Sequence, residues 1–318
     1  MADLSATIVI PTKNRKDDLR RAVVSCLNQT VPLEVLVIDD GSTDGTAEMV
    51  KREFPGIRFH REEVSKGATV ERNRGVTMAS GSIVFSIDDD ADFPSRHTVA
   101  QTLAEFDSPE VGVVSIPLIN VNQSPEVLQR APSPDGIWVR DIFWGGACAI
   151  RREVFLRVGG YREYLRQQHE EDDLAIRILD AGYFTRLGNG DPIHHYESPI
   201  RDRRRHDILG GRNKVLFAWH NVPMPDFLLY LPATCLKTLA KGVREGRGPR
   251  SALGIAKGLY AFIDQFGERK PVRRETYRLY RRMRNSTGVR IEEAKRDVPV
   301  GNAAGFAAEH AQPQAPRG

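Results

Sequence analysis

The first 120 residues alternate short apolar runs with segments of helical periodicity, and this alternation most constrains the fold. The apolar runs lie at residues 6–10, 33–38, 57–60, 82–87 and 111–116. Between the first two runs, apolar side chains recur at helical spacing at Leu19, Ala22, Val23, Cys26 and Leu27. Repeated strand–helix–strand order predicts an α/β fold, with a mostly parallel, Rossmann-like sheet covered by helices on both faces.

Carboxylates stand where two of these predicted strands end. Asp39 and Asp40 follow one strand, and Asp88, Asp89 and Asp90 follow another. In open α/β sheets, ligands bind at the carboxyl ends of the strands. Three adjacent negative charges repel one another, and a hard divalent cation with oxygen ligands would relieve the repulsion. The triplet alone is equally compatible with a solvated acidic turn, and the pair with a helix-capping turn.

A second acidic cluster opens a helix that we expect to begin near Glu170 and end at Gly182. Its first residues are Glu170, Glu171, Asp172 and Asp173. The helix dipole favours acids at this end, but four in a row exceed what a cap requires. One of them could therefore accept a proton from a reacting hydroxyl.

Two further features of this region carry expectations. Asp173 and Arg177 are spaced to form a surface ion pair on this helix. Downstream, the imidazoles of His194 and His195 could complete a metal site or contact a diphosphate, or they could be structural.

Charge divides the chain into two halves. Residues 201–318 hold 24 Lys and Arg against 11 Asp and Glu, whereas residues 1–200 are acidic overall. We expect a ligand-binding domain at 1–200, a basic helical appendage at 201–296 and a disordered tail at 297–318. The apolar segment 225–231, with lysines and arginines after it, suits a helix lying on an anionic membrane surface, although an ordinary solvated subdomain fits equally well.

Cellular location is constrained by cysteine usage and by hydropathy. The three cysteines are far apart and lack metal-ligand spacing, which is typical of a reducing cytosol. We expect neither a signal peptide nor a membrane-spanning segment. The arginine clusters lack interleaved aromatic residues and a reading motif, so we expect no nucleic-acid partner.

Taken together, these segments resemble the family 2 glycosyltransferases, whose nucleotide-sugar-binding fold is called glycosyltransferase A. The resemblance covers roughly residues 5–200 and follows the family's order of motifs. The matching segments are Val9 to Arg15, Val37 to Thr46, Glu71 to Gly75, Asp88 to Asp90, Gly145 to Tyr161 and Glu170 to Leu174. Two residues depart from the family pattern: Glu71 replaces an alanine, and Glu171 stands where an aspartate is usual.

The resemblance implies three groups of site residues. The nucleotide-sugar-binding residues would be Pro11, Thr12, Asn14, Arg15, Asp40, Arg72, Asp88 and Asp89. Asp88, Asp90 and His195 would hold Mg²⁺ or Mn²⁺. The catalytic base would be Glu171, or Asp172 if the register shifts by one residue.

The implied function is an inverting, metal-dependent transfer of a hexosyl or deoxyhexosyl group from a nucleotide-diphosphate sugar to a hydroxyl. The acceptor would be a glycan or a lipid-linked molecule of cell-envelope polysaccharide or glycolipid synthesis. The enzyme would be cytoplasmic, with a peripheral position on the inner face of the cell membrane as a further expectation. The alternative is a non-catalytic nucleotide- or glycan-binding scaffold of the same fold.

Overall fold

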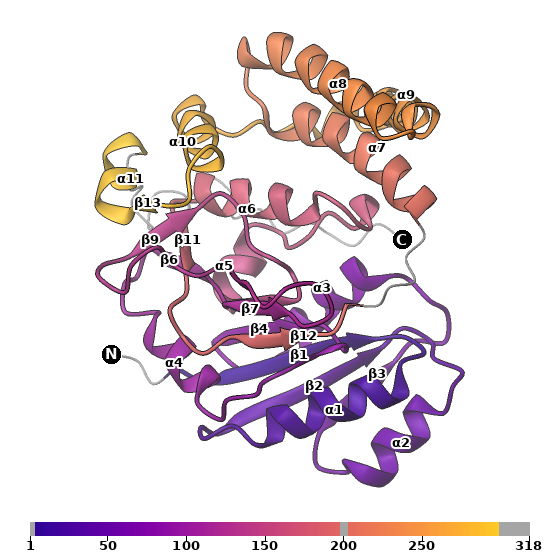
Figure 1. Cartoon of the computed structure of the whole chain (residues 1–318), viewed down its shortest axis with the longest axis vertical. Helices are drawn as coiled ribbons and strands as arrows, with labels where there is room; N and C mark the ends of the chain where they lie inside the picture. Colours follow the sequence, from indigo (N-terminus) through magenta and orange to yellow (C-terminus); the bar gives the residue numbers. More distant parts are fainter. Residues whose placement is uncertain (1–3, 198–202, 299–318) are drawn as a thin grey trace.

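The main sheet crosses the lower and middle parts of the molecule in the view of Figure 1. The computed structural model describes residues 4–197 and 203–298. Within them nine strands pair in the order β13-β9-β11-β6-β10-β4-β1-β2-β3. Their bounds are β1 Ala6–Thr12, β2 Leu33–Asp39, β3 Arg58–Arg61, β4 Ile83–Ile87, β6 Val111–Ser115, β9 Trp138–Arg140, β10 Ala147–Arg151, β11 Phe184–Leu187 and β13 Val289–Arg290.

The first four strands of this sheet, β1 to β4, are parallel, as the strand–helix alternation predicted. Strand β10 runs antiparallel between β4 and β6, and β9 and β13 are also antiparallel to their neighbours. The predicted mostly parallel α/β class is therefore confirmed. The half of the sheet formed by β1 to β4 is parallel, and the other half is mixed.

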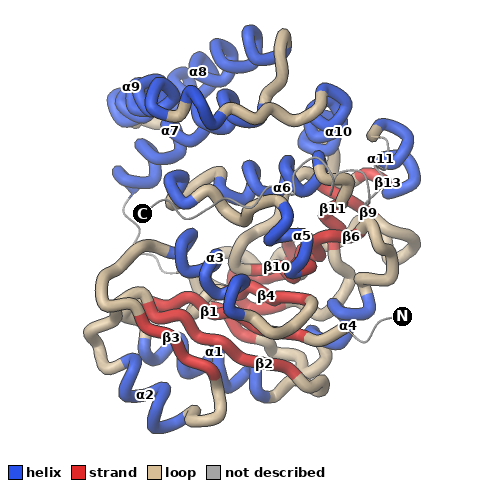
Figure 2. The backbone as a smooth tube through the Cα atoms, turned by 180° about the vertical axis from the view of Figure 1, so that it is seen from behind, coloured by secondary structure: helices blue, strands red, loops and turns tan. Residues whose placement is uncertain are grey.

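Each face of the parallel half is buried under helices, which explains why its strands are continuously apolar. Ile8 and Ile10 share a core with α1 (Lys16–Leu27), whereas Val9 packs with α3 (Ala68–Met78) on the opposite face. Figure 2 shows α3 and α1 on either side of β1 and β2. Leu27, predicted to share the buried face of α1, is 53% exposed because it lies in the last turn.

The remaining helices of this part are α2 Thr46–Glu53, α4 Thr98–Ala104, α5 Arg152–Arg157, the 3₁₀ turn η1 Glu163–Leu165 and α6 Glu170–Asp180. Of these, α5 and α6 pack on the same face of the main sheet as α3. A second sheet, in the order β5-β12-β7-β8, covers the carboxyl ends of β4 and β6. Its strands are β5 Ala91–Asp92, β7 Leu118–Asn120, β8 Val127–Leu128 and β12 Ile193–His195.

The C-terminal part contains two arrangements. Helices α7 (Arg203–Asn221), α8 (Asp226–Arg244) and α9 (Gly248–Asp264) form an outer layer beyond α6 (Figure 1). The short turn η2 (Phe266–Glu268) then leads to α10 (Arg274–Arg284), β13 and α11 (Ile291–Asp297), which return to the edge of the main sheet. In the described part of the chain, no helix combines the length and the hydropathy that a membrane span requires.

The predicted boundary near residue 200 falls in residues 198–202, outside the described residues, as does the predicted tail from 299 onward. Residues 289–298 share the core of the main sheet, although the prediction assigned most of them to the appendage.

The predicted ion pair of Asp173 with Arg177 is formed, at 2.8 Å, but it is not on the surface, because Asp173 is fully buried. Its carboxylate accepts hydrogen bonds from Arg177 at 2.8 Å, from Arg162 and, at 2.8 Å, from the Asn221 side chain at the end of α7. The bond from Asn221 therefore joins α6 to α7 of the outer helical layer.

We predict that Asp173→Ala destabilises the protein by roughly 3–5 kcal/mol, because it leaves two guanidinium groups without their buried partner. Asp17→Ala removes an exposed ion pair with Arg20 and should change stability by about 0.5 kcal/mol or less. Urea unfolding of both variants measures the difference. Equal effects would show that the buried pair contributes no more than the exposed one.

Candidate active site

The carboxyl end of β4 carries the centre of the site. Ligand atoms of Asp88, Asp90 and His195 all lie within 4.8 Å of one another. The two carboxylates supply the oxygen ligands that both predicted cations accept, and the imidazole nitrogen fits the transition metal Mn²⁺ better than Mg²⁺.

The small sheet positions the imidazole of this group. Strand β12 pairs with β5 and β7, which places His195 next to Ala91 and Asn120. The Nδ1–H of His195 donates to Asn120 Oδ1 at 2.7 Å, and Nε2 faces Asp90 Oδ1 at 3.2 Å. A hydrogen bond of this kind fixes the tautomer and leaves Nε2 free to act as a ligand.

The middle aspartate of the triplet points to β1. Asp89 accepts a hydrogen bond from the Thr12 hydroxyl at 2.8 Å, and its other oxygen lies 3.2 Å from Arg15 Nη1. The same Arg15 nitrogen lies 2.5 Å from Asp90. Burial raises the pKa of Asp89 to about 7 despite Arg15. Although burial also opposes ionisation of Asp90, its bonds to His195 and Arg15 lower its pKa to about 2.

Two consecutive glycines bring the acid of α6 close to this group. A Cβ on Gly146 would overlap the Asp88 carboxylate, and a Cβ on Gly145 would lie 3.0 Å from Glu171 Oε1 and 3.4 Å from the Arg72 guanidinium. Arg72 itself donates to Asp88 at 2.6 Å, and the Gly145 N–H faces Glu171 Oε1 at 3.3 Å. The predicted base and metal residues therefore border one site.

The four acids that open α6 face different environments. Asp172 is buried and bonded to His169 at 3.0 Å, to the Tyr280 hydroxyl at 3.0 Å and to Arg284. Although burial opposes it, these partners hold the pKa of Asp172 below its usual range. Asp173 is bonded as described above.

Glu170 and Glu171 have no such cationic partners in hydrogen-bond contact. Glu170 is buried, whereas Glu171 is partly exposed beside Gly145. Burial first, and the neighbouring Glu170 second, raise the pKa of Glu171 above its usual value. A carboxylate with a raised pKa is a better proton acceptor.

Hydrogen bonds join the loops after β1 and β2, which are expected to hold the nucleoside. Asp40 accepts hydrogen bonds from the Ser65 hydroxyl at 2.6 Å and from the Lys66 N–H at 2.6 Å. Asn14 has a left-handed backbone with φ of +53°. Its N–H donates to Ser42 Oγ at 2.9 Å, and its side-chain oxygen accepts from the Thr43 N–H at 2.7 Å.

The predicted site residues thus form two neighbouring groups. Side-chain contacts connect Thr12, Arg15, Arg72, Asp88, Asp89, Asp90 and His195, with Glu171 joined through Gly145. Asp40 and Asn14 hold the adjacent loops, while Pro11 is buried in β1 opposite Ile38. Asp172 faces α10.

Sequence reasoning did not anticipate two kinds of residue here. Tyr280 and Arg284 contact Asp172 from more than 100 positions away. Glu71 is fully buried, and neither of its oxygens has a hydrogen-bond partner among the described residues. Burial, with the nearby Asp40 carboxylate, raises the pKa of Glu71 to about 7. The sequence offered one signal for this residue: Glu71 stands where the resembled family motif has an alanine.

Known glycosyltransferases resemble this chain in sequence. A glycosyltransferase of Escherichia coli, YibD, is 36% identical over 110 residues, which are 33% of this chain and 32% of that protein. The succinoglycan biosynthesis protein ExoU of Rhizobium meliloti is 34% identical over 201 residues, covering 57% and 58% of the two chains. Each match spans less than two thirds of the relative's length.

Solved structures share the fold. The mannosyltransferase PcManGT of Pyrobaculum calidifontis, in complex with GDP-Man and Mn²⁺, has a TM-score of 0.56 at 24% identity and covers 89% of this chain and 85% of its own. S. aureus TarS in complex with UDP-GlcNAc has a TM-score of 0.55 at 16% identity, covering 68% and 66%. The family model described as glycosyl transferase family 2 matches residues 7–171, more than half of the 318 residues. The chain belongs to glycosyl transferase family 2.

Proposed function

We propose that this glycosyltransferase moves a sugar, with inversion, from a nucleoside-diphosphate sugar to a hydroxyl acceptor in a single displacement. One observation carries the proposal. The partly exposed Glu171, with its raised pKa, borders the same site as Asp88, Asp90 and His195. A proton acceptor and a cation site for a diphosphate are the two requirements of this reaction.

The donor end of the site lies at the loops after β1 and β2. We assign nucleoside contacts to Pro11, Thr12, Asn14, Arg15 and Asp40, with Arg72, Asp88 and Asp89 completing the donor site. Asp88, Asp90 and His195 would hold Mg²⁺ or Mn²⁺, which neutralises charge on a departing diphosphate when bound. Arg15 and Arg72 supply fixed positive charge beside the same carboxylates.

Glu171 is the proposed base, and Asp172 is not. The ion pair of Asp172 with Arg284, together with its bonds to His169 and Tyr280, stabilises its charged form and turns it toward α10. Glu171 instead faces the glycine pair beside Asp88. In the reaction, the acceptor hydroxyl loses its proton to Glu171 as its oxygen bonds to the anomeric carbon. The bond from that carbon to the diphosphate oxygen breaks on the opposite face, which inverts the configuration.

The classes of donor sugar and acceptor are inferred from the relatives. Their printed names include succinoglycan biosynthesis and a poly(ribitol-phosphate) N-acetylglucosaminyltransferase, TarP, which support a hexosyl donor and an envelope glycan or glycolipid acceptor. The three cysteines are free, which supports a cytoplasmic location. The scaffold alternative keeps the fold but requires no base beside the metal group.

We predict that Glu171→Gln lowers kcat by about 10²–10⁴-fold, because the amide cannot accept the proton. Binding of UDP or GDP with Mn²⁺ should be retained, since Glu171 does not belong to the metal group. Turnover assays with the cognate donor and calorimetry of nucleotide binding measure the two effects. A non-catalytic scaffold would show no turnover in the unmodified protein.

Glu170→Gln provides a second test, through pH. The Glu170 carboxylate raises the pKa of Glu171, so its neutral amide should lower that pKa. The base is then deprotonated at lower pH, and the acidic limb of the kcat profile should move to lower pH. A shift to higher pH would contradict this electrostatic coupling.

Asp90→Asn should abolish the thermal stabilisation that UDP or GDP gives in the presence of Mn²⁺, because the cation loses a charged ligand. A chelator should have the same effect on the unmodified protein. Asp92→Asn, two residues along and outside the metal group, is the matched control. If nucleotide stabilisation is insensitive to Asp90→Asn and to chelation, the cation assignment is wrong.

A further inference from the structure

Helices α8 and α9 carry most of their large apolar side chains on the outer side, although Phe227, Tyr230 and Leu231 at the start of α8 pack against the core. The buried residues of α9 are all small: Gly248, Ser251, Gly254 and Gly258. On α8 only Gly242 is buried. In an ordinary solvated helix the large apolar residues occupy the buried face. Most of α8 and α9 shows the opposite arrangement, with small residues buried and large apolar residues exposed.

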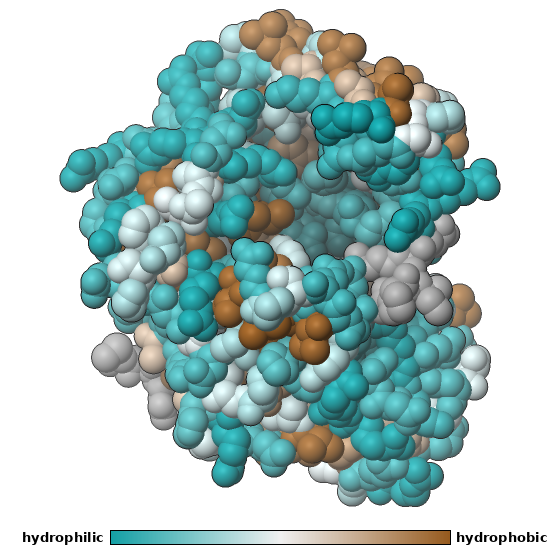
Figure 3. Space-filling view, viewed as in Figure 1, coloured by the Kyte–Doolittle hydropathy of each residue, from teal (hydrophilic) through white to brown (hydrophobic). Residues whose placement is uncertain are grey.

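The exposed apolar residues recur at helical spacing and therefore lie on one side of each helix, where they form a stripe. On α8 they are Leu228, Leu229, Leu236, Leu239 and Val243, and on α9 and the turn after it they are Leu253, Leu259, Tyr260, Ile263 and Phe266. Leu229 is 80% exposed and Tyr260 70%. Figure 3 shows the apolar colour gathered over the outer helical layer, above a mostly hydrophilic surface. A concentration of this kind marks an interaction surface.

Close packing on the inner side requires this arrangement. A Cβ on Gly254 would lie 2.5 Å from the Ile208 carbonyl oxygen and 3.1 Å from Gly211 of α7. A Cβ on Gly258 would lie 2.7 Å from Val215. Because α9 lies so tightly on α7 at Gly254 and Gly258, large side chains have no room at this contact and most of them face outward; Phe262, one turn further along, packs on Trp219 of α7.

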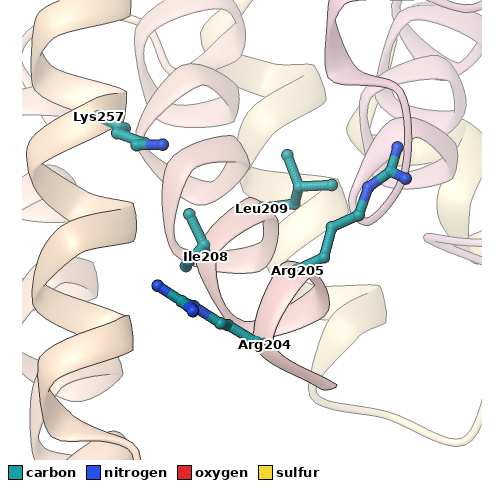
Figure 4. Close-up of a pocket in the computed structure, with 5 residues that line it drawn as sticks. All are labelled: Arg204, Arg205, Ile208, Leu209 and Lys257. Carbon is teal, nitrogen blue, oxygen red and sulfur yellow. The ribbon is translucent and has the colours of Figure 1, made fainter. Parts of the chain in front are cut away.

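Positive charge borders the apolar stripes. Exposed lysines and arginines border both stripes. Beside the α8 stripe they are Lys237, Lys241 and Arg244, and beside the α9 stripe they are Arg250 and Lys257. Between α7 and α9 lies a pocket of about 310 Å³, lined by Arg204, Arg205, Ile208, Leu209 and Lys257 (Figure 4). Cationic groups next to aliphatic side chains match a phosphate headgroup and the start of its acyl chain.

We propose that the outer face of α8 and α9 docks on the surface of an anionic phospholipid bilayer, with both helices lying in the interface plane. Apolar stripes bordered by lysine and arginine are the pattern of interfacial helices. Charge complementarity favours anionic lipid over a second copy of this chain, which would oppose like-charged borders. The inference is independent of the proposed chemistry, because vesicle binding requires no turnover.

Docking at this face would hold the active site at a set orientation to the lipid. Asn221, the last residue of α7, is bonded to Asp173 at the start of α6, the helix that carries Glu171. The outer layer is therefore joined to the catalytic helix by buried contacts.

Flotation with vesicles tests the proposal. The unmodified protein should float with phosphatidylglycerol–phosphatidylcholine vesicles and, in low salt, far less with phosphatidylcholine alone. Leu229→Glu with Ile263→Glu should weaken binding by at least about tenfold, because the stripes then carry charge. Lys237→Glu with Arg244→Glu should remove the preference for anionic lipid.

Leu27→Glu with Lys51→Glu, on α1 and α2, is the matched control and should float like the unmodified protein. Far-UV circular dichroism and the thermal unfolding midpoint, measured in parallel, show that each variant is folded. The proposal is overturned if the unmodified protein does not float, or if the stripe variant floats equally well. It is also overturned if that variant only converts a dimer to a monomer in light scattering, without a change in flotation.

Discussion

Buried negative charge at the start of α6 is the constraint on which this structure depends. Two of its four acids are neutralised by arginines, Asp173 by Arg162 and by Arg177 of α6 itself, and Asp172 by Arg284 of α10. Buried carboxylates without such partners would be strongly destabilising. The C-terminal helices therefore support the helix that carries the proposed base: α10 supplies a counter-charge and α7 supplies Asn221.

This neutralisation leaves Glu171 available for chemistry. The glycine pair before β10 then decides what it faces, since side chains at Gly145 and Gly146 would separate Glu171 from Arg72 and Asp88. The small sheet completes the arrangement by bringing His195 from β12 to the end of β4. The proposed proton acceptor and the candidate cation site thus lie beside each other, on elements that are far apart in the chain.

The outer layer follows a different packing rule from the core. In the sheet, large aliphatic side chains fill both faces, whereas α9 meets α7 through glycines, and α8 and α9 expose most of their large aliphatic residues. Both halves obey the same preference to remove apolar surface from water. For the sheet the covering is supplied by helices of the same chain, and for α8 and α9 we propose that lipid supplies it.

The sequence by itself determined the strands, their acidic ends and the order of motifs, because apolar periodicity and turn residues act over a few positions. It predicted the parallel half of the sheet, and it named Asp88, Asp90 and His195, which the fold brings together as a candidate metal group. It left open which of the acids at 170–173 serves as base, since that depends on partners such as Asn221 and Arg284, whose approach only the folded chain specifies. Tertiary structure also decided which side of α9 is buried: local spacing reveals a stripe of large residues and a stripe of glycines, and the close approach of α7 selects the glycines.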